Sequence, residues 1–169
     1  MTLSIAIAGA GGRMGRALVR AAHEDPRFAV CGGTEHSEGQ FLGIDLGALA
    51  GIAPLMMNTS ETANLAADKA EVWIDFTSPE GSVAALDALV GTPVKAAVIG
   101  TTGLSETQEA KIAEHAKRIA IVMGAAVAVL AGPVLFSPLF GAEHAGAAAV
   151  LPWLLPWFVL QHLTTMFQA

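Results

Sequence analysis

The stretch that decides the fold is Ile5-Ala-Ile-Ala-Gly9-Ala-Gly-Gly12-Arg13-Met14-Gly15. An apolar strand pattern over residues 3–8 stops at glycines spaced three apart, and an amphipathic helix pattern begins at Arg13. Gly9 lets the chain turn sharply, Gly12 lets the backbone approach a pyrophosphate, and Gly15 lets the helix lie close to the strand. The free N–H groups of the first helical turn then face the anion. Other α/β proteins use glycines in similar turns, but the pattern is typical of a dinucleotide-binding domain.

An acidic residue after the second predicted strand, residues 28–33, supports this interpretation. Glu35 stands about 20 residues beyond Gly15, where this fold places the carboxylate that accepts hydrogen bonds from the adenosine ribose. Without the glycine pattern, Glu35 would be interpreted as a solvated loop residue. His36 follows, where enzymes that accept a 2′-phosphate usually carry arginine. We therefore expect NADH or NADPH as cofactor, with a preference for NADH.

The composition limits the class of protein. The 169 residues are enough for one domain, or for one domain with an appendage. The net charge is -6 and lysine and arginine do not cluster, which argues against a nucleic-acid surface. The single cysteine, Cys31, falls in a predicted strand and is interpreted as a buried thiol. No secretion signal is evident, so we expect a cytoplasmic protein. We assign no metal site.

Strand and helix patterns alternate from residue 1 to about residue 123. The predicted strands are 3–8, 28–33, 72–76, 94–99 and 119–123, with a short one near Leu55, and the predicted helices are 13–23, 61–68, 81–90 and 106–117. Ser78-Pro79 suits a helix start, and Ser105 with Gln108 resembles a capping box. The alternation predicts an α/β fold: a Rossmann-type doubly wound parallel sheet with helices on both faces.

Two further loops follow predicted strands, at the sheet edge where such folds bind ligands. They are Asp75-Phe-Thr-Ser-Pro-Glu-Gly81 and Val98-Ile-Gly-Thr-Thr-Gly-Leu104. Phe76 is placed to lie against a nicotinamide ring, and the threonines of the second loop offer hydroxyls and amides for a carboxamide or carboxylate. Each loop taken alone is more often a simple turn.

The segments AIAGAGGRMGR, DFTSPEGS and VIGTTGL, in this order and spacing, together resemble the N-terminal domain of 4-hydroxy-tetrahydrodipicolinate reductase, also called dihydrodipicolinate reductase. That family works in the diaminopimelate route to lysine. The resemblance covers residues 1–123 and implies an NAD(P)H-dependent reductase lineage whose substrate is a small dicarboxylate. The implied cofactor-binding residues are Gly9, Ala10, Gly11, Gly12, Arg13, Met14, Gly15, Glu35, His36, Phe76, Thr77, Gly100, Thr101 and Thr102, and Thr102 also lies near substrate.

The resemblance ends at Gly124. There the family has an asparagine-containing loop that contacts cofactor and leads to the substrate domain, whereas this chain continues Gly124-Ala-Ala-Val-Ala-Val-Leu130. The family's His-His-x-x-x-Lys segment and its Asp-Ala-Pro-Ser-Gly-Thr loop have no counterpart. No lysine or arginine follows Arg118, so no cation is available there to bind a dicarboxylate. We therefore assign no catalytic residue and expect no turnover from this chain alone.

Residues 124–169 form an apolar tail, which we expect to be helical. Two interpretations remain open: a short membrane hairpin, or a buried edge or flap that pairs two copies. A gene fusion, a truncation or a change of reading frame would each produce this boundary. The leading function is the NAD(P)H-binding portion of the reductase. The alternative is a non-catalytic nucleotide-binding module that is tethered or paired through its tail.

Overall fold

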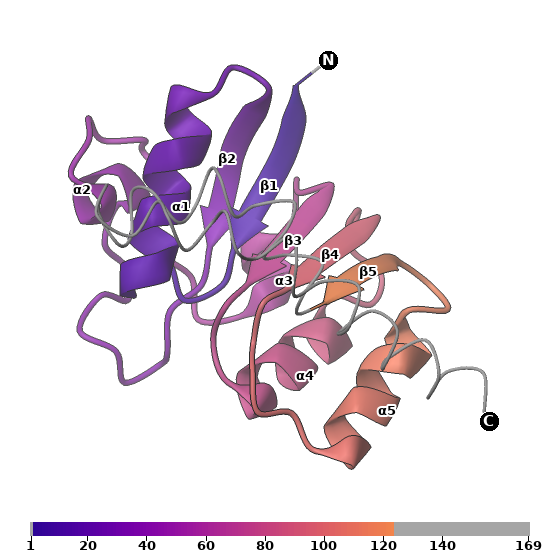
Figure 1. Ribbon diagram of the computed structural model, residues 1–169. Coiled ribbons are helices and arrows are strands. Elements are labelled where there is room, and N and C mark those ends of the chain that lie inside the picture. The colour runs from indigo at the N-terminus through magenta and orange to yellow at the C-terminus, as the bar shows by residue number, and fades with distance from the viewer. Residues whose placement is uncertain (1, 124–169) are drawn as a thin grey trace, which may run out of the picture.

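The computed structural model of the chain describes residues 2–123, which form one α/β unit (Figure 1). The boundary between a dinucleotide-binding domain and a tail therefore stays a prediction. The expected helical tail, residues 124–169, and its membrane or homo-oligomer contacts lie outside the described residues.

Five parallel strands form one sheet. They are β1 (Leu3–Ile7), β2 (Phe28–Gly33), β3 (Val72–Asp75), β4 (Ala96–Ile99) and β5 (Ala120–Met123), in the order β2-β1-β3-β4-β5. Every pair of neighbours is parallel. The order reverses direction at β1 and β3, which creates the switch point beside which doubly wound sheets bind their ligands. The predicted Rossmann-type fold is confirmed.

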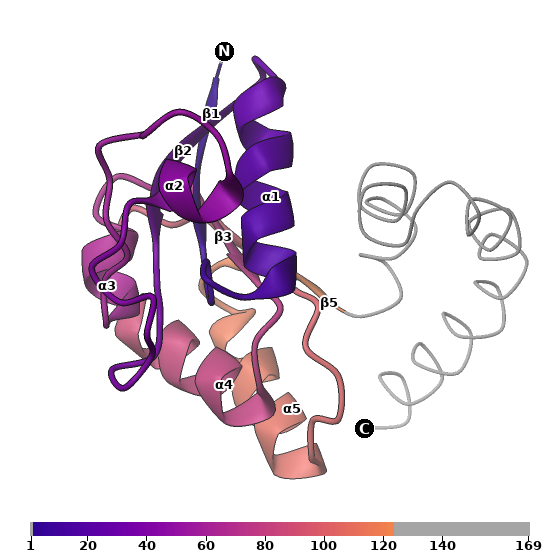
Figure 2. The ribbon, with the colours of Figure 1, turned by 90° about the vertical axis from the view of Figure 1, so that its left-hand side faces the viewer.

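Helices cover both faces of this sheet. On one face lie α1 (Arg13–Glu24) and α2 (Leu46–Ala50), and on the other lie α3 (Ala63–Ala66), α4 (Pro79–Ala88) and α5 (Glu106–His115). Figure 2 shows α1 and α3 on opposite sides of the strands. Two apolar clusters, one under each group of helices, result from this arrangement.

Alternation along β1 supplies both clusters. Ile5 and Ile7 pack with the α1 side, whereas Ala6 and Ala8, the residue directly after β1, pack with the α4 side. All four are buried, so both faces of β1 are covered, as in a central parallel strand. This packing fixes the carboxyl ends of β1, β3 and β4 at one edge of the sheet.

The segment between β2 and β3 differs most from the sequence prediction. The short strand expected near Leu55 is wrong, and α2, which was not predicted, lies before it. Asp45 explains the difference, because its carboxylate caps α2 by accepting from Ala48 N and also accepts from the backbone N–H groups of Leu55 and Met57. These hydrogen bonds hold the pKa of Asp45 below its usual range. N–H groups that a strand would use in a ladder are thus bound by one side chain.

Other boundaries shift by a few residues. The helix expected over 61–68 is reduced to Ala63–Ala66, and α4 begins at Pro79 rather than residue 81. Both predicted capping residues, Ser78 and Ser105, are confirmed. Ser78 Oγ accepts from Gly81 N at 3.1 Å, and Ser105 forms a full capping box with Gln108.

Cys31 is half-buried on β2. Its Sγ donates a hydrogen bond to the carbonyl of Ile5 at 3.2 Å, and burial raises the pKa of the thiol. A raised pKa leaves little thiolate at neutral pH, in agreement with a structural thiol. No helix within residues 2–123 is long and apolar enough to cross a membrane.

Candidate functional site

The loop between β1 and α1, residues 8–12, has the geometry of a phosphate-binding turn. Gly9 has a φ of 60°, a left-handed conformation, and its carbonyl accepts from Gly12 N at 2.9 Å. A Cβ on Gly15 would lie 2.2 Å from Gly9 O and 2.6 Å from Ala10 Cα. Glycine is therefore required at Gly15 for the helix to pack against the turn, as the sequence predicted.

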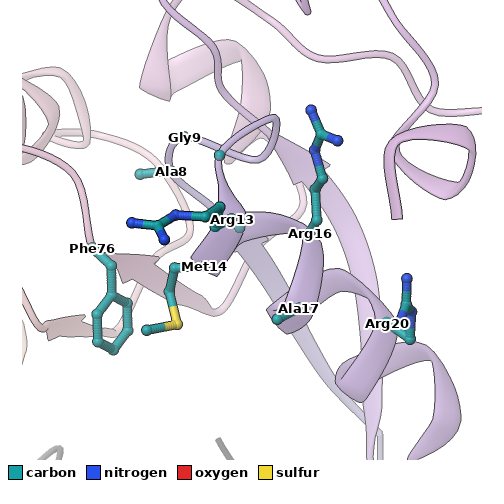
Figure 3. Close-up of a pocket in the computed structure, with 10 residues that line it drawn as sticks. Ala8, Gly9, Arg13, Met14, Arg16, Ala17, Arg20 and Phe76 are labelled. Carbon is teal, nitrogen blue, oxygen red and sulfur yellow. The ribbon is translucent and has the colours of Figure 1, made fainter. Parts of the chain in front are cut away.

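The first turn of α1 is open to a ligand. The first N–H groups of an α-helix have no intrahelical partner, and Gly12, the N-cap residue of α1, has no side chain with which to cap them. A cavity of about 500 Å³ lies at this point (Figure 3). It is lined by Ala8, Gly9, Gly12, Arg13, Met14, Gly15, Arg16, Ala17, Arg20 and Phe76. Free N–H groups, a helix N-terminus and guanidinium groups make this cavity suited to a diphosphate.

Glu35 contacts the phosphate loop directly. Its Oε2 accepts from Gly11 N at 3.1 Å and its Oε1 accepts from His36 N at 2.9 Å. A Cβ on Gly11 would lie 2.3 Å from Glu35 Oε2, so glycine is needed there for this contact. The predicted ribose acid is thus adjacent to the predicted phosphate site. His36 is exposed, and its Nδ1 accepts from Glu38 N at 3.2 Å.

Arg16 and Phe41, which the sequence analysis did not single out, hold the other side of Gly11. Arg16 Nε donates to the Gly11 carbonyl at 2.7 Å, and its guanidinium lies 4.4 Å from the centre of the Phe41 ring. Thr59 Oγ1 donates to the Phe41 carbonyl at 2.6 Å and fixes that loop. The phosphate loop is therefore held at both the N–H and the carbonyl of Gly11. Arg16 is the last residue of the motif AIAGAGGRMGR, and this position was the only sequence signal for its role.

The loops after β3 and β4 meet on the opposite side of the switch point. The ring of Phe76 packs on Gly100, where a Cβ would lie 2.0 Å from the ring. The methyl group of Thr77 packs on Gly9, and both its N–H and its hydroxyl donate to the buried carboxylate of Asp75, at 2.9 and 2.6 Å. Gly100 N donates to the Asp75 carbonyl at 2.8 Å. Asp75 was quoted in the motif but given no role.

The two threonines of the second loop have different surroundings. Thr101 is buried, and its hydroxyl is 2.6 Å from the hydroxyl of Ser82 on α4. Thr102 is exposed and its hydroxyl makes no hydrogen bond with the described residues. Of these two threonines, Thr102 is the more exposed to solvent.

The predicted residues therefore fall into two groups at one edge of the sheet. Gly9 to Gly15 with Glu35 and His36 form the first, and Phe76, Thr77, Gly100, Thr101 and Thr102 form the second. Phe76 and Met14 both line the cavity and connect the groups. Figure 3 shows Arg13 reaching toward the side of Met14 and Phe76, whereas Arg16 and Arg20 project from the other side of α1. The donors, the acid and the glycine-lined turn fit a dinucleotide.

Known proteins with a similar sequence contain the same domain. The family model described as the N-terminus of dihydrodipicolinate reductase matches residues 3–127. A curated 4-hydroxy-tetrahydrodipicolinate reductase from Chromohalobacter salexigens is 42% identical over 118 residues, which are 70% of this chain and 44% of that relative. The chain thus spans less than half the length of this relative.

Solved structures support the fold. Dihydrodipicolinate reductase from Paenisporosarcina sp. TG-14, solved with dipicolinate bound, gives a TM-score of 0.57 at 22% identity over 77% of this chain and 51% of that one. An amine dehydrogenase from Mycobacterium smegmatis also gives 0.57, at 19% identity over 73% of this chain and 38% of that one. Since the family model covers most of the sequence, this chain belongs to the dihydrodipicolinate reductase family and contains its N-terminal, NAD(P)H-binding domain.

Proposed function

We propose that this chain is the cofactor-binding portion of a 4-hydroxy-tetrahydrodipicolinate reductase, which acts in the diaminopimelate route to lysine. The observation that carries the proposal is the position of Gly11. Its N–H bonds to Glu35 and its carbonyl bonds to Arg16, so the ribose acid and the phosphate loop form one unit. Family membership supplies the reaction class.

Different residues of the site are assigned to different parts of the cofactor. The first turn of α1, from Arg13 to Gly15, binds the pyrophosphate through its free N–H groups. Glu35 accepts hydrogen bonds from the adenosine ribose, either in place of its bond from Gly11 N or in addition to it. Phe76, which packs on Gly100, is assigned to the nicotinamide, and the exposed Thr102 is assigned to the substrate. When bound, the cofactor supplies a hydride to a cyclic imine-type dicarboxylate.

We also propose that residues 1–123 are the dinucleotide-binding domain and that the 169-residue chain has no turnover by itself. Hydride transfer requires the acceptor to be oriented at the nicotinamide and its charge to be matched. After Arg118 the sequence contains no lysine or arginine that would bind two carboxylates. The relative from Chromohalobacter salexigens is more than twice as long as the matched segment.

A coupled assay with freshly generated substrate and NADH tests this function. We expect the chain alone to stay at background, and a chimera that joins residues 1–123 to the remainder of the Chromohalobacter relative to oxidise NADH when substrate is added. The relative itself is the positive control. A folded chimera that binds NADH but never turns over would contradict the assignment, and turnover by the unmodified chain would contradict the need for a further domain.

The second candidate function is a non-catalytic nucleotide-binding module, tethered to a membrane or paired with a second copy through residues 124–169. The charge distribution favours it, because Glu143 is the sole charged side chain after Arg118 at neutral pH with histidine uncharged. Failure of the chimera together with saturable NADH binding by the full chain would favour this candidate. The cytoplasmic location stays a prediction.

A further inference from the structure

A pair of buried hydroxyls lies behind the loop after β4. Ser82, in the first half of α4, is fully buried, and Thr101 is 6% exposed. Their oxygens are 2.6 Å apart, a short distance for a hydrogen bond between two hydroxyls. This contact joins α4 to a loop whose other residues have no polar side-chain contact to that helix among the described residues.

The pair contains two protons but only one hydrogen bond. Either hydroxyl can be the donor in the bond between them, and the described residues provide no other hydrogen bond to either one. If Thr101 donated to Ser82, the proton of Ser82 would be left without an acceptor at a fully buried position, which is unfavourable. If Ser82 donates, the remaining proton belongs to Thr101, which is also buried but stands in the loop after β4, where a bound ligand can provide the acceptor.

We infer that Ser82 is a positioning residue for the nicotinamide end of the cofactor, an inference that rests on the proposed function. Ser82 donates to Thr101 and fixes its rotamer, so that the Thr101 hydroxyl donates its own proton to an acceptor on the ligand. An acceptor of suitable chemistry is the carbonyl oxygen of the nicotinamide carboxamide. Thr101 thus acts as a donor, and Ser82 acts through Thr101 without touching the cofactor.

The surrounding loop fixes the backbone that carries the Thr101 hydroxyl. Gly100 N is bonded to the Asp75 carbonyl, and the ring of Phe76 packs on Gly100. The backbone just before Thr101 is therefore held by β3. Only the rotation of the Thr101 side chain is left to be set, and the bond from Ser82 sets it.

The test compares NADH with ADP-ribose, which lacks the nicotinamide ring, on the full chain and on Ser82→Ala, Thr101→Val and Thr101→Ser. For the unmodified chain we expect NADH to bind roughly 3- to 10-fold more tightly than ADP-ribose, the range for one hydrogen bond. Ser82→Ala and Thr101→Val should lose most of that ratio and leave ADP-ribose binding within about 2-fold. Thr101→Ser, which keeps the hydroxyl, should retain it.

A double variant decides whether the two hydroxyls act together. Ser82→Ala combined with Thr101→Val should weaken NADH binding no more than either change alone. The fluorescence of bound NADH gives a second measurement, since it reports the surroundings of the nicotinamide and should change at saturation in Ser82→Ala. Thermal unfolding of each variant verifies that it is folded.

The outcomes separate two failures. If the unmodified, folded chain binds neither ligand, the proposed function is wrong and the inference is overturned with it. If the chain binds both ligands but Ser82→Ala leaves the NADH to ADP-ribose ratio unchanged, or weakens both ligands equally, Ser82 has a structural role alone and the inference is overturned by itself.

Discussion

The two ends of the candidate site are built from different chemistry. At the adenosine end, which comprises the phosphate loop with Glu35, Arg16 and Phe41, charged side chains hold backbone groups of Gly11. At the nicotinamide end, which comprises Phe76, Thr77 and residues 100–102, hydroxyls are bonded to buried partners, and Thr102 is the exposed one of the two loop threonines.

The difference predicts a division between overall cofactor affinity and recognition of the nicotinamide. The proposed adenosine end has its candidate anion site, its acid and its supporting cation within residues 9–41. The nicotinamide end presents a ring, a glycine-rich turn and few exposed polar groups. We therefore expect changes at the adenosine end to govern affinity for any adenine dinucleotide, and changes at the nicotinamide end to govern the contribution of the nicotinamide alone.

The largest effect is expected at the adenosine end, from Gly15→Ala. Its Cβ would lie 2.2 Å from the Gly9 carbonyl oxygen, so α1 must move, and we expect a loss of about 3 kcal/mol in the free energy of unfolding. Gly12→Ala is the matched control, because its Cβ meets only Gly9 O, at 3.2 Å. It should lower the unfolding midpoint much less than Gly15→Ala does, but weaken NADH binding roughly 10-fold or more by obstructing the pyrophosphate. Denaturant unfolding and NADH titration measure the two effects, and equal stability of both variants would contradict the packing described for Gly15.

The next effect concerns the choice between NADH and NADPH. In the proposed role, the Glu35 carboxylate would accept hydrogen bonds from two ribose hydroxyls but repel a 2′-phosphate, a difference of about 1 to 3 kcal/mol or one to two decades in affinity. Glu35→Gln should reduce the preference for NADH, chiefly by improving NADPH binding. Competition titrations of both cofactors measure the ratio. Tighter binding of NADPH than NADH by the unmodified chain would show that Glu35 does not select at the adenosine end.

A smaller effect is expected from Arg16→Met, which keeps an apolar stem but removes the donor to Gly11 O. Loss of one charge-assisted hydrogen bond and of the stacking on Phe41 should weaken NADH and ADP-ribose equally, by roughly 3- to 10-fold. Phe41→Leu should have about half that free-energy effect, since the bond to Gly11 remains. If Arg16→Met changed the NADH to ADP-ribose ratio, the division of the site into two ends would be wrong.

The smallest expected effect is a pH dependence of stability in acid, caused by Asp45 in the loop that contains Phe41. The pKa of Asp45 is held below its ordinary value of 3.8 by backbone hydrogen bonds, with Ala48 the largest contributor. The stabilisation by Asp45 is therefore present above pH 3.8 and is lost as the pH falls through the folded-state pKa. Asp45→Asn should lower the thermal midpoint at neutral pH and flatten its decline below pH 4. An identical decline in the variant would show that other groups control the acid limb.

The fold was largely predictable because its signals are local. The period of apolar residues, the turn at Gly9, the close packing at Gly15 and the caps at Ser78 and Ser105 each involve residues close in sequence, and each was confirmed. The loop from residue 36 to 60 was not, because Asp45 bonds N–H groups ten and twelve residues away. Such contacts leave no periodic pattern.

The site shows the same limit. The predicted positions of the glycines and Glu35 follow from one motif and one spacing. Other roles depend on contacts between segments that are distant in sequence. Phe41 reaches Arg16 from the loop after β2, and Ser82 reaches Thr101 from α4. A sequence alone does not state which side chains of neighbouring elements meet.

Isothermal titration of NADH into the full 169-residue chain tests whether the described residues already form a dinucleotide site, with circular dichroism to verify the fold. We predict saturable binding of one NADH per chain with a Kd below about 1 mM, and competition by ADP-ribose for the same site. A folded chain that shows no saturable heat or NADH fluorescence change up to millimolar cofactor would contradict a complete adenosine end in residues 9–41.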